Sequence, residues 1–204
     1  MNFDKFNAAL TEAVNDEGLL DFCRKWVLHG TPHIFQGRED EFYEFRKKIA
    51  DGLHVSFHEV FITGSAKLGF SPHKGTDFSY DSDIDVAIIS PSLFESVMGS
   101  IYKFQVDLRR YRRAIDEREL AMYHEFLEYA AIGWIRPDKL PLSFKVRELK
   151  KDWFDFFDSL SYGKSEVGDY KVTAGAFKNY YYLEQYIVSG LRSARTKAMV
   201  ELEK

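Results

Sequence analysis

The chain has 204 residues, which is enough for one domain, or for one domain with an appended helical segment. Its apolar fraction of 45% and charged fraction of 29% are ordinary for a globular protein, which excludes a largely disordered chain, a collagen and a coiled-coil rod. The net charge of −4 argues against a protein that coats duplex nucleic acid nonspecifically, but it leaves room for a nucleotide bound at one local site.

The cellular setting follows from what the sequence lacks. The single cysteine, Cys23, cannot form an internal disulfide, and no zinc-ligand spacing is present. The N-terminal residues carry acids early instead of the basic-then-apolar pattern of a signal peptide. No run approaches the roughly 18 uninterrupted apolar residues of a membrane span. We therefore expect a cytoplasmic protein without a membrane partner.

The first quarter of the chain is predicted to be helical. Apolar residues recur at helical spacing over residues 3–29, which indicates one or two helices with a break at residues 16–18. A further helix is expected over Glu39–Ile49, with Gly52 just past its end. Residues 1–52 thus form a predicted helical N-terminal extension.

The hydrophobic period then changes to that of strands. Val55–Thr63 is rich in β-branched and aromatic residues and runs into Gly64, so we expect a strand. Residues 66–82 are rich in Gly, Ser, Asp and Pro and are predicted to be a loop, with at most one helical turn at its start. Asp83–Ile89 is predicted to be a second strand. Residues 53–90 therefore carry the expected catalytic strands.

The remainder, residues 91–204, is predicted to be mainly helical with one late strand. A capping-box pattern at residues 92–95 indicates the start of a long helix. The following elements are a helix over 117–133, a turn at 136–141, a helix over 144–160, a short strand over 170–174 and a final helix over 177–200. The prediction is a single domain, residues 1–204, of the α+β class.

Two acids on the second predicted strand carry most of the chemical information. Asp83 and Asp85 are two residues apart, so strand alternation puts both side chains on one face, about 7 Å apart at Cα. Ile84 points the other way, towards the core. Adjacent carboxylates repel, and a divalent cation removes that cost. Oxygen ligands on a rigid element suit Mg²⁺ that shares its coordination with a substrate phosphate.

Gly64 and Ser65 follow the first predicted strand. A glycine there lets the backbone approach a ligand closely, and the Ser65 hydroxyl can add a hydrogen bond to a phosphate. Lys67 and Lys74 are near enough in sequence to offer positive charge. Gly64, Ser65 and Lys67 are therefore the candidate nucleotide-binding residues.

The segment Ile62-Thr63-Gly64-Ser65, followed by Ser82-Asp83-Ile84-Asp85-Val86, resembles the Gly-Ser and Asp-x-Asp signature of the DNA polymerase β-like nucleotidyltransferases. The resemblance is strong over residues 60–89 and weak over residues 170–195. It implies a nucleotidyltransferase-like mixed β-sheet flanked by helices, here with additional N- and C-terminal helices.

The same resemblance implies an activity. A nucleoside triphosphate would bind at Gly64 and Ser65, with Asp83 and Asp85 as ligands of two Mg²⁺ ions, Mn²⁺ being the alternative metal. A nucleotidyl group would pass to a hydroxyl of a nucleic acid, a nucleotide or a protein, releasing pyrophosphate. Small bacterial members act in antiviral defence and toxin–antitoxin systems, which implies a partner protein from such a system.

A third carboxylate, which active members carry on a later strand, has no obvious position. Val106-Asp107-Leu108 has the right local pattern but lies in a helical period, and Asp138 lies in a turn. Asp169 is the favoured candidate, because it shares a face with Lys171 and Thr173 if the late strand begins early. Without a third acid, the alternative is a degenerate fold that binds a nucleotide or another protein.

Two further motifs are left open. Arg109-Arg110-Tyr111-Arg112-Arg113 is either a phosphate-binding patch with an aromatic ring in it or, as we favour, a solvated helix face balanced by the acids that follow. Tyr180-Tyr181-Tyr182 is expected to serve in packing, with base stacking as the alternative. The six histidines show no metal-ligand spacing.

Overall fold

The computed structural model describes residues 2–139 and 147–202. The helices are α1 (Phe3–Glu12), α2 (Asp16–Phe22), α3 (Glu39–Leu53), α4 (Gly64–Leu68), α5 (Pro91–Arg109), α6 (Glu117–Ala131), α7 (Arg147–Asp158) and α8 (Tyr180–Leu202). The strands are β1 (Val60–Thr63), β2 (Phe70–Ser71), β3 (Thr76–Asp77), β4 (Ile84–Ile89), β5 (Trp134–Ile135) and β6 (Val172–Phe177). Short helical segments are η1 (Cys23–Leu28), η2 (His33–Phe35), η3 (Phe57–Glu59) and η4 (Pro137–Lys139). The predicted α+β class is confirmed.

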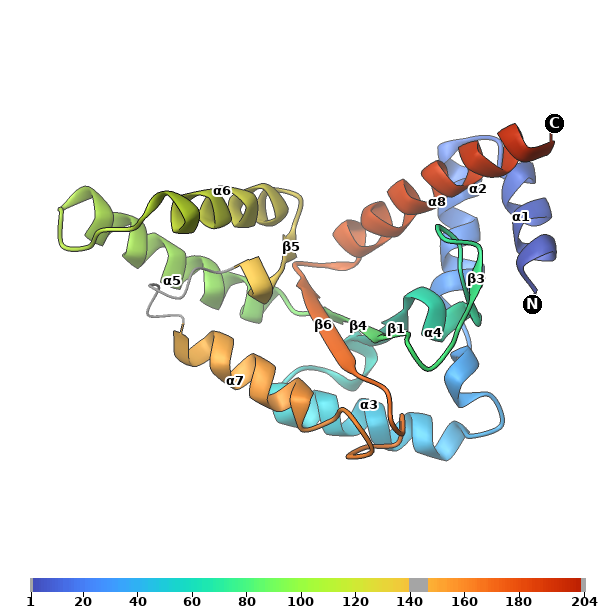
Figure 1. The fold of residues 1–204 in the computed structure, drawn as a ribbon, viewed down its shortest axis with the longest axis horizontal. Coiled ribbons are helices and arrows are strands. Elements are labelled where there is room, and N and C mark those ends of the chain that lie inside the picture. The colour runs from blue at the N-terminus through green and yellow to red at the C-terminus, as the bar shows by residue number, and fades with distance from the viewer. Residues whose placement is uncertain (1, 140–146, 203–204) are drawn as a thin grey trace.

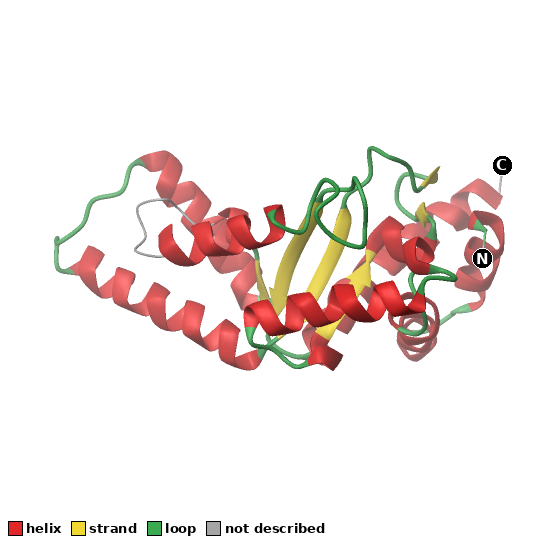
Figure 2. Cartoon of the chain, turned by 90° about the horizontal axis from the view of Figure 1, so that it is seen from below, coloured by secondary structure: helices red, strands yellow, loops and turns green. Residues whose placement is uncertain are grey.

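A small mixed sheet lies at the centre of the molecule, with helices around it (Figures 1 and 2). Its strand order is β1-β4-β6-β5, and β2 and β3 form a separate hairpin. β4 runs antiparallel to β1 and parallel to β6, while β5 is antiparallel to β6. β4 and β6 are therefore central, and each is paired on both sides.

The two faces of this sheet are covered differently. One face carries Ile84, Val86 and Ile88 of β4, which are fully or almost fully buried in the main core beneath α3, α5, α6 and α7. The opposite face carries Ala87 and Ile89, which pack in a smaller cluster with residues of α8. Because α8 covers only part of that face, Asp85 on the same side of β4 keeps an exposed surface.

The C-terminal part of α8 packs against the N-terminal helices, so the two ends of the chain lie at the same end of the molecule (Figure 1). Phe6 and Leu10 of α1 are fully buried there beside Val188 and Leu191 of α8. The predicted N-terminal extension therefore shares a hydrophobic core with the last helix.

Two of the N-terminal predictions need correction in their boundaries. The first helical break falls at residues 13–15, not 16–18, because the Asn15 side chain accepts a hydrogen bond from the Gly18 amide and starts α2 at Asp16. α3 continues to Leu53, so Gly52 lies inside it. A Cβ at Gly52 would stand 2.3 Å from the Phe156 ring, which shows that glycine here makes room for α7.

The predicted strand over Val55–Thr63 is shorter than expected. Ser56 and Glu59 form a capping box that folds residues 57–59 into η3, and only Val60–Thr63 is extended. Likewise, the long helix α5 begins at Pro91 instead of residue 92, because the Ser90 hydroxyl accepts from the Leu93 amide.

Other differences concern elements too short to show a period. The predicted loop at 66–82 contains most of α4 and the β2–β3 hairpin, and the two-residue strand β5 was not predicted. The late strand runs over 172–177 instead of 170–174. Parts of the predicted turn at 136–141 and helix at 144–160 lie outside the described residues. Over the ranges that are described, no helix has the length and apolar character needed to cross a membrane.

Candidate functional site

The first part of the site is the turn from β1 into α4. Thr63 ends β1 in an extended conformation, and Gly64 then adopts a left-handed conformation with φ of +64°. A Cβ at Gly64 would lie 2.5 Å from Oδ2 of Asp85, closer than any real side chain permits. Glycine is therefore required twice here, for the backbone conformation and for the approach of the carboxylate.

The second part is a row of three residues across the sheet. In the antiparallel pairing Thr63 stands opposite Asp85, and in the parallel pairing Asp85 stands opposite Thr173. The alternation of β4 turns Ile84 into the core and Asp85 to the opposite face, as predicted. Gly64 and Asp85, 21 positions apart in sequence, are thus brought together by the β1–β4 pairing.

Protein atoms crowd the Asp85 carboxyl although part of the residue remains exposed. This burial raises the pKa of Asp85, and the negative charge of Asp83 raises it further. Two neighbours act in the opposite direction: the Thr173 hydroxyl, which donates to Asp85 Oδ1 over 3.1 Å, and the Lys171 ammonium. The net effect is a carboxylate whose charge is only partly compensated by protein groups.

Lys171 compensates the neighbouring acid. Its Nζ atom lies 3.7 Å from Oδ2 of Asp83, and both side chains are about half exposed, at 47% and 45%. An ion pair with that exposure contributes little stability, about 0–1 kcal/mol. It can therefore open at small cost when a stronger cation or an anionic ligand enters the site.

The acid pair and the glycine turn fit a divalent cation that is shared with a ligand. Asp85 on β4 and Asp83, which directly precedes this strand, offer hard oxygen donors whose charges interact, and Gly64 lets the turn approach the Asp85 carboxylate. Mg²⁺ commonly takes one or two protein carboxylates and completes its shell with water and substrate phosphate oxygens. Within residues 2–139 and 147–202, no group of three or more acidic, histidine or cysteine side chains is placed to hold a metal.

The candidates for a third acid are all engaged elsewhere or lie in other surroundings. Asp107 lies near Arg112 and Arg113, and Asp138 pairs with Arg136 over 2.7 Å. Asp169 lies in a bend before β6, and its carboxylate is next to Gly163: a Cβ built on that glycine would be 3.1 Å from Asp169 Oδ1. The strand begins at Val172, so strand alternation does not reach Asp169, and its assignment rests on the sequence alone.

The position opposite Asp85 is occupied by a hydroxyl and not by a carboxylate. Thr173 is the β6 residue in direct register with Asp85, and Lys171, directly before β6, pairs with Asp83. At the edge of the site, Thr173 thus supplies a neutral hydrogen-bond donor and Lys171 supplies a cation, and neither supplies a carboxylate.

Lys67 has a different environment from the one predicted. It is only 7% exposed, and its ammonium donates to the carbonyl oxygens of His29 and Gly30, the latter over 2.6 Å. Burial lowers the pKa of Lys67 to about 8. The side chain ties α4 to the end of η1. Ser65 remains partly exposed, and Lys74 is exposed in the connection between β2 and β3. A role for Lys67 in binding nucleotide stays a prediction.

Sequence reasoning missed an aromatic side chain, Tyr186, that interacts electrostatically with Asp85. Tyr186 of α8 has a pKa raised mainly by burial and further by the charge of Asp85, while Arg136 acts in the opposite direction. Its ring centroid lies 4.5 Å from that of Trp134 on β5. The only signal in the sequence was that Tyr186 follows Tyr182 at helical spacing. That spacing does not show that α8 packs on the sheet face that carries Asp85.

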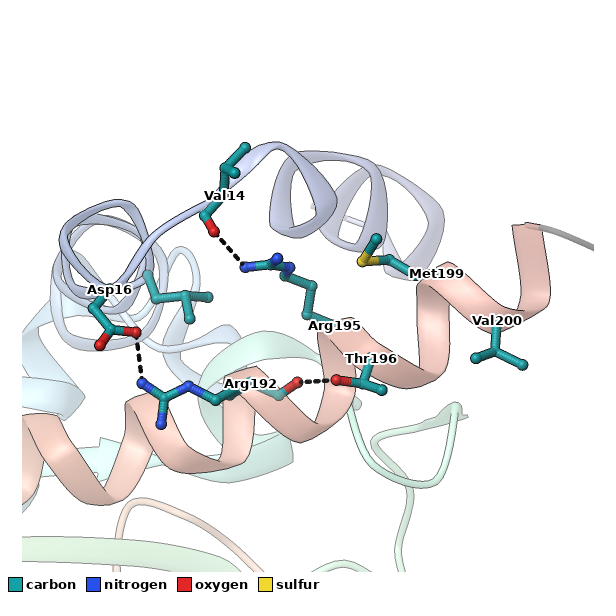
Figure 3. A pocket seen from close by; sticks show the side chains of 8 residues that line it. Val14, Asp16, Arg192, Arg195, Thr196, Met199 and Val200 are labelled. Atoms are coloured by element: carbon teal, nitrogen blue, oxygen red, sulfur yellow. Dashed lines mark hydrogen bonds and ion pairs between the residues drawn. The ribbon is translucent and has the colours of Figure 1, made fainter.

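A cavity of about 450 Å³ lies elsewhere, between α8 and the loop that joins α1 to α2. Figure 3 shows Arg195 reaching the carbonyl oxygen of Val14, over 3.2 Å, and Arg192 pairing with Asp16 over 2.7 Å. These contacts fasten the last helix to the N-terminal helices. The lining residues belong to that junction and include none of the predicted site residues.

Comparison with known proteins finds no matching family model, no matching curated protein and no matching solved structure.

Proposed function

We propose that this protein has a nucleotidyltransferase-like fold and binds a nucleoside triphosphate together with Mg²⁺ or Mn²⁺, transferring the nucleotidyl group to a hydroxyl acceptor. The observation that carries the proposal is the meeting of Asp85 with the glycine turn: its carboxylate fills the space that a side chain at residue 64 would take. Asp83, directly before β4, completes the acidic pair, since its charge acts on Asp85. A lone Asp-x-Asp would carry no such weight.

Each residue then has a defined task. Asp83 and Asp85 would hold the divalent cation, which when bound neutralises phosphate charge and polarises the reacting phosphorus. The backbone of the Gly64 turn and the Ser65 hydroxyl would hold the phosphate tail. In the transfer, the acceptor oxygen bonds to the α-phosphorus, the bond to the β-phosphate bridging oxygen breaks, pyrophosphate leaves and the hydroxyl proton passes to water.

The experiment is incubation of the purified protein with each labelled nucleoside and deoxynucleoside triphosphate, with Mg²⁺ or Mn²⁺, followed by measurement of pyrophosphate release and labelled product. Acceptors to be supplied are a short oligonucleotide, a free nucleotide and a candidate protein, including a neighbour from a defence or toxin–antitoxin locus. The wild type is expected to turn over at least one triphosphate. The Asp83→Asn, Asp85→Asn double variant is expected to lose the activity.

The matched control is Asp81→Asn, which removes an exposed acid from the same loop and leaves both candidate ligands in place. It should retain wild-type turnover. Equal turnover by the double variant and the wild type would refute a role for the acid pair. Absence of both binding and turnover with every triphosphate would refute the proposed function.

A second candidate function is a non-catalytic module that binds a nucleotide or another protein. The observation that favours it is the pairing of Asp85 with Thr173, and of Asp83 with Lys171, where a further carboxylate would be expected of an active enzyme. Such a module would bind the triphosphate without releasing pyrophosphate. Turnover that disappears in the double variant would exclude it.

Lys171→Ala separates the two ways in which this lysine can act. If Lys171 serves only as an internal cation for Asp83, its removal should raise the affinity for Mn²⁺ alone by up to about 5-fold, the equivalent of about 1 kcal/mol. If it also contacts the triphosphate, the same variant should bind the metal–triphosphate complex more weakly. Titration calorimetry with Mn²⁺, then with a non-hydrolysable triphosphate, distinguishes these results.

A further inference from the structure

The α5–α6 hairpin projects from the sheet to the end of the molecule opposite the chain termini (Figures 1 and 2). Its two helices are joined by packing between Phe104 and Tyr123, whose ring centroids lie 5.8 Å apart, and by a hydrogen bond from Gln105 to the Tyr123 hydroxyl. The Arg109–Arg113 segment ends α5 at the exposed tip. None of the residues proposed above for nucleotide binding lies on this hairpin.

The backbone at the tip holds a tyrosine where a helix normally ends with glycine. The amide of Arg112 donates to the Asp107 carbonyl over 2.9 Å, and the amide of Tyr111 donates to the Leu108 carbonyl over 3.0 Å. These two bonds define a Schellman motif, in which the left-handed residue is usually glycine. Here that residue is Tyr111, with φ of +54°.

The Tyr111 side chain is not buried by the fold, so packing does not offset the strain of this conformation. It is 96% exposed, more than any other large hydrophobic side chain of the described residues. An L-residue in the left-handed region is strained compared with glycine. A strained residue with a fully exposed ring is better explained by a contact with a partner than by folding.

Four arginines flank Tyr111 in sequence. Arg112 and Arg113 lie 4.0 and 3.8 Å from the Asp107 carboxylate, while Arg109 and Arg110 are exposed and have no ion pair within the described residues. The nearest acids on the other side of the loop begin α6, where Asp116 is committed to capping the Glu119 amide. Positive charge is therefore concentrated on the α5 side of the tip, in a chain whose overall charge is −4.

We propose that the tip formed by Arg109–Arg113 is a binding surface for single-stranded nucleic acid, with Tyr111 stacking on a base and the arginines contacting the flanking phosphates. An exposed aromatic ring between cations provides both interactions that such strands offer, and a stacked base typically contributes about 1–3 kcal/mol. An acidic protein could form ion pairs with the arginines, but this interaction would not explain an exposed aromatic ring in a strained conformation. This surface does not rest on the proposed nucleotide site, which lies on the sheet.

The test is binding of fluorescein-labelled 12-nucleotide RNA and DNA, measured by anisotropy over a range of salt concentrations. Tyr111→Gly is the decisive variant, since glycine relieves the left-handed strain: its melting temperature should equal or exceed that of the wild type while its affinity falls by at least about 5-fold. The double variant Arg109→Gln, Arg110→Gln should lower the salt slope by roughly 1.4, about 0.7 for each lost phosphate contact on a single strand.

Matched controls sit elsewhere on the same molecule. Tyr102→Ala removes a 71% exposed ring from the body of α5, and Lys5→Gln with Lys47→Gln removes two charges from α1 and α3. Both variants should bind the strands as the wild type does. An abasic strand of the same length should bind more weakly and should be insensitive to Tyr111→Gly.

Three results would overturn the proposal. The first is absence of binding to either strand by the wild type near physiological ionic strength. The second is unchanged affinity in both tip variants. The third is tighter binding of polyglutamate than of either strand, with the same loss in the arginine variant, which would assign the tip to an acidic protein. Preference for RNA over DNA, or the reverse, with loss in Tyr111→Gly supports it and identifies the source of the strand.

Discussion

Thr173 stands in direct register with Asp85 across the parallel pair β4–β6, and its hydroxyl donates a 3.1 Å hydrogen bond to Asp85 Oδ1. The two residues are 88 positions apart in sequence, and only the sheet brings them together. This pairing leaves the candidate site with two acids, because the neighbouring strand contributes a hydroxyl at the position where it could contribute a third.

Thr173→Asp is therefore expected to convert the site into one with three carboxylates. Without metal, the added charge beside Asp85 should lower the melting temperature, since like charges resist being held together. With Mn²⁺, affinity should rise by about tenfold, equivalent to about 1.4 kcal/mol. The measurements are thermal melts in chelator and Mn²⁺ titration calorimetry.

Thr173→Asn is the control for this substitution, because it changes the shape of the side chain without adding charge. If the two variants bind Mn²⁺ equally well, Thr173 does not face the metal site. A gain in pyrophosphate release by Thr173→Asp would further indicate that the missing acid limits turnover in the natural chain.

Gly64→Ala should damage the site through both conformation and contact. The backbone of the alanine would have to keep a φ of +64°, and its Cβ would stand 2.5 Å from Asp85 Oδ2. Either the turn or the carboxylate must therefore move. We expect a loss of about 1–2 kcal/mol in unfolding free energy, from the left-handed backbone, and a loss of metal-dependent triphosphate binding. Chemical denaturation and calorimetry measure the two effects.

Gly99→Ala is the matched control. Gly99 lies within α5 and has no atom within 4 Å of its added Cβ, so alanine should stabilise the protein by about 0.5–1 kcal/mol. A Gly64→Ala variant that is as stable and as active as Gly99→Ala would contradict the geometry of the turn.

Asp85→Asn should make the metal-free protein more stable at neutral pH. Burial raises the pKa of Asp85 in the folded state, so the folded protein holds this proton more tightly than the unfolded chain does. Stability therefore falls as the pH rises from the unfolded-state pKa through the raised folded-state pKa of Asp85, above which the ionised carboxylate destabilises the fold. Asparagine can still accept from Thr173 and avoids the charge. Because solvent screens this partly exposed carboxylate, the gain should be at most about 1 kcal/mol, or about 2–4 °C in melting temperature.

The pH dependence is the control for this prediction. The difference between Asp85→Asn and the wild type should be largest near pH 7 and shrink towards acid, where the wild-type carboxyl is protonated in both states. Addition of Mg²⁺ and a non-hydrolysable triphosphate should stabilise the wild type but not the variant. A variant that is less stable at pH 7 and unchanged in its response to ligand would count against the acidic site.

The acid pair illustrates how much of this arrangement is readable from sequence. Alternation along a six-residue strand fixes that Ile84 is buried and that Asp85 faces the other way, and both are found so. Gly64 also follows the first strand directly, as the sequence predicted. These are local properties, set by the strand period and by the conformational freedom of one residue.

What lies opposite Asp85 could not be predicted, because it depends on which strands pair and in which register. A shift of one residue in β6 would have turned Thr173 away and brought Val172 to the site. The same holds for Lys67, which has the sequence appearance of a surface cation. It is buried because α4 packs against the end of η1, and that contact leaves no trace in the local pattern.

Short elements could not be predicted from the sequence for a related reason. The strand Trp134–Ile135 has only two residues, too few to show alternation, and is defined by its partners Phe177 and Ala176 on β6. Similarly, Gly52 was expected just past the end of a helix, whereas it lies within α3, where the Phe156 ring leaves no room for a Cβ.

Lys67→Met tests whether Lys67 serves the fold or the ligand. The substitution leaves the carbonyl oxygens of His29 and Gly30 without their donor, which should cost about 1–3 kcal/mol of unfolding free energy. Because the ammonium is already engaged, triphosphate affinity should change by less than about 3-fold at a temperature where the variant is folded. Denaturation and calorimetry at pH 7 measure both quantities, and a large loss of affinity without loss of stability would restore Lys67 to the nucleotide site.

The pH dependence of this difference has a defined sign. The pKa of Lys67 is about 8 in the folded protein and 10.5 for an ordinary lysine, so between these values the unfolded chain binds more protons than the folded one. The wild type should therefore gain stability, relative to Lys67→Met, as the pH rises through this window, because the neutral amine is buried without the cost of its charge and still donates to both carbonyls. Paired urea denaturation curves from pH 7 to about pH 10.5 measure the change. A difference that stays constant or shrinks over that range would show that Lys67 is solvated in the native state.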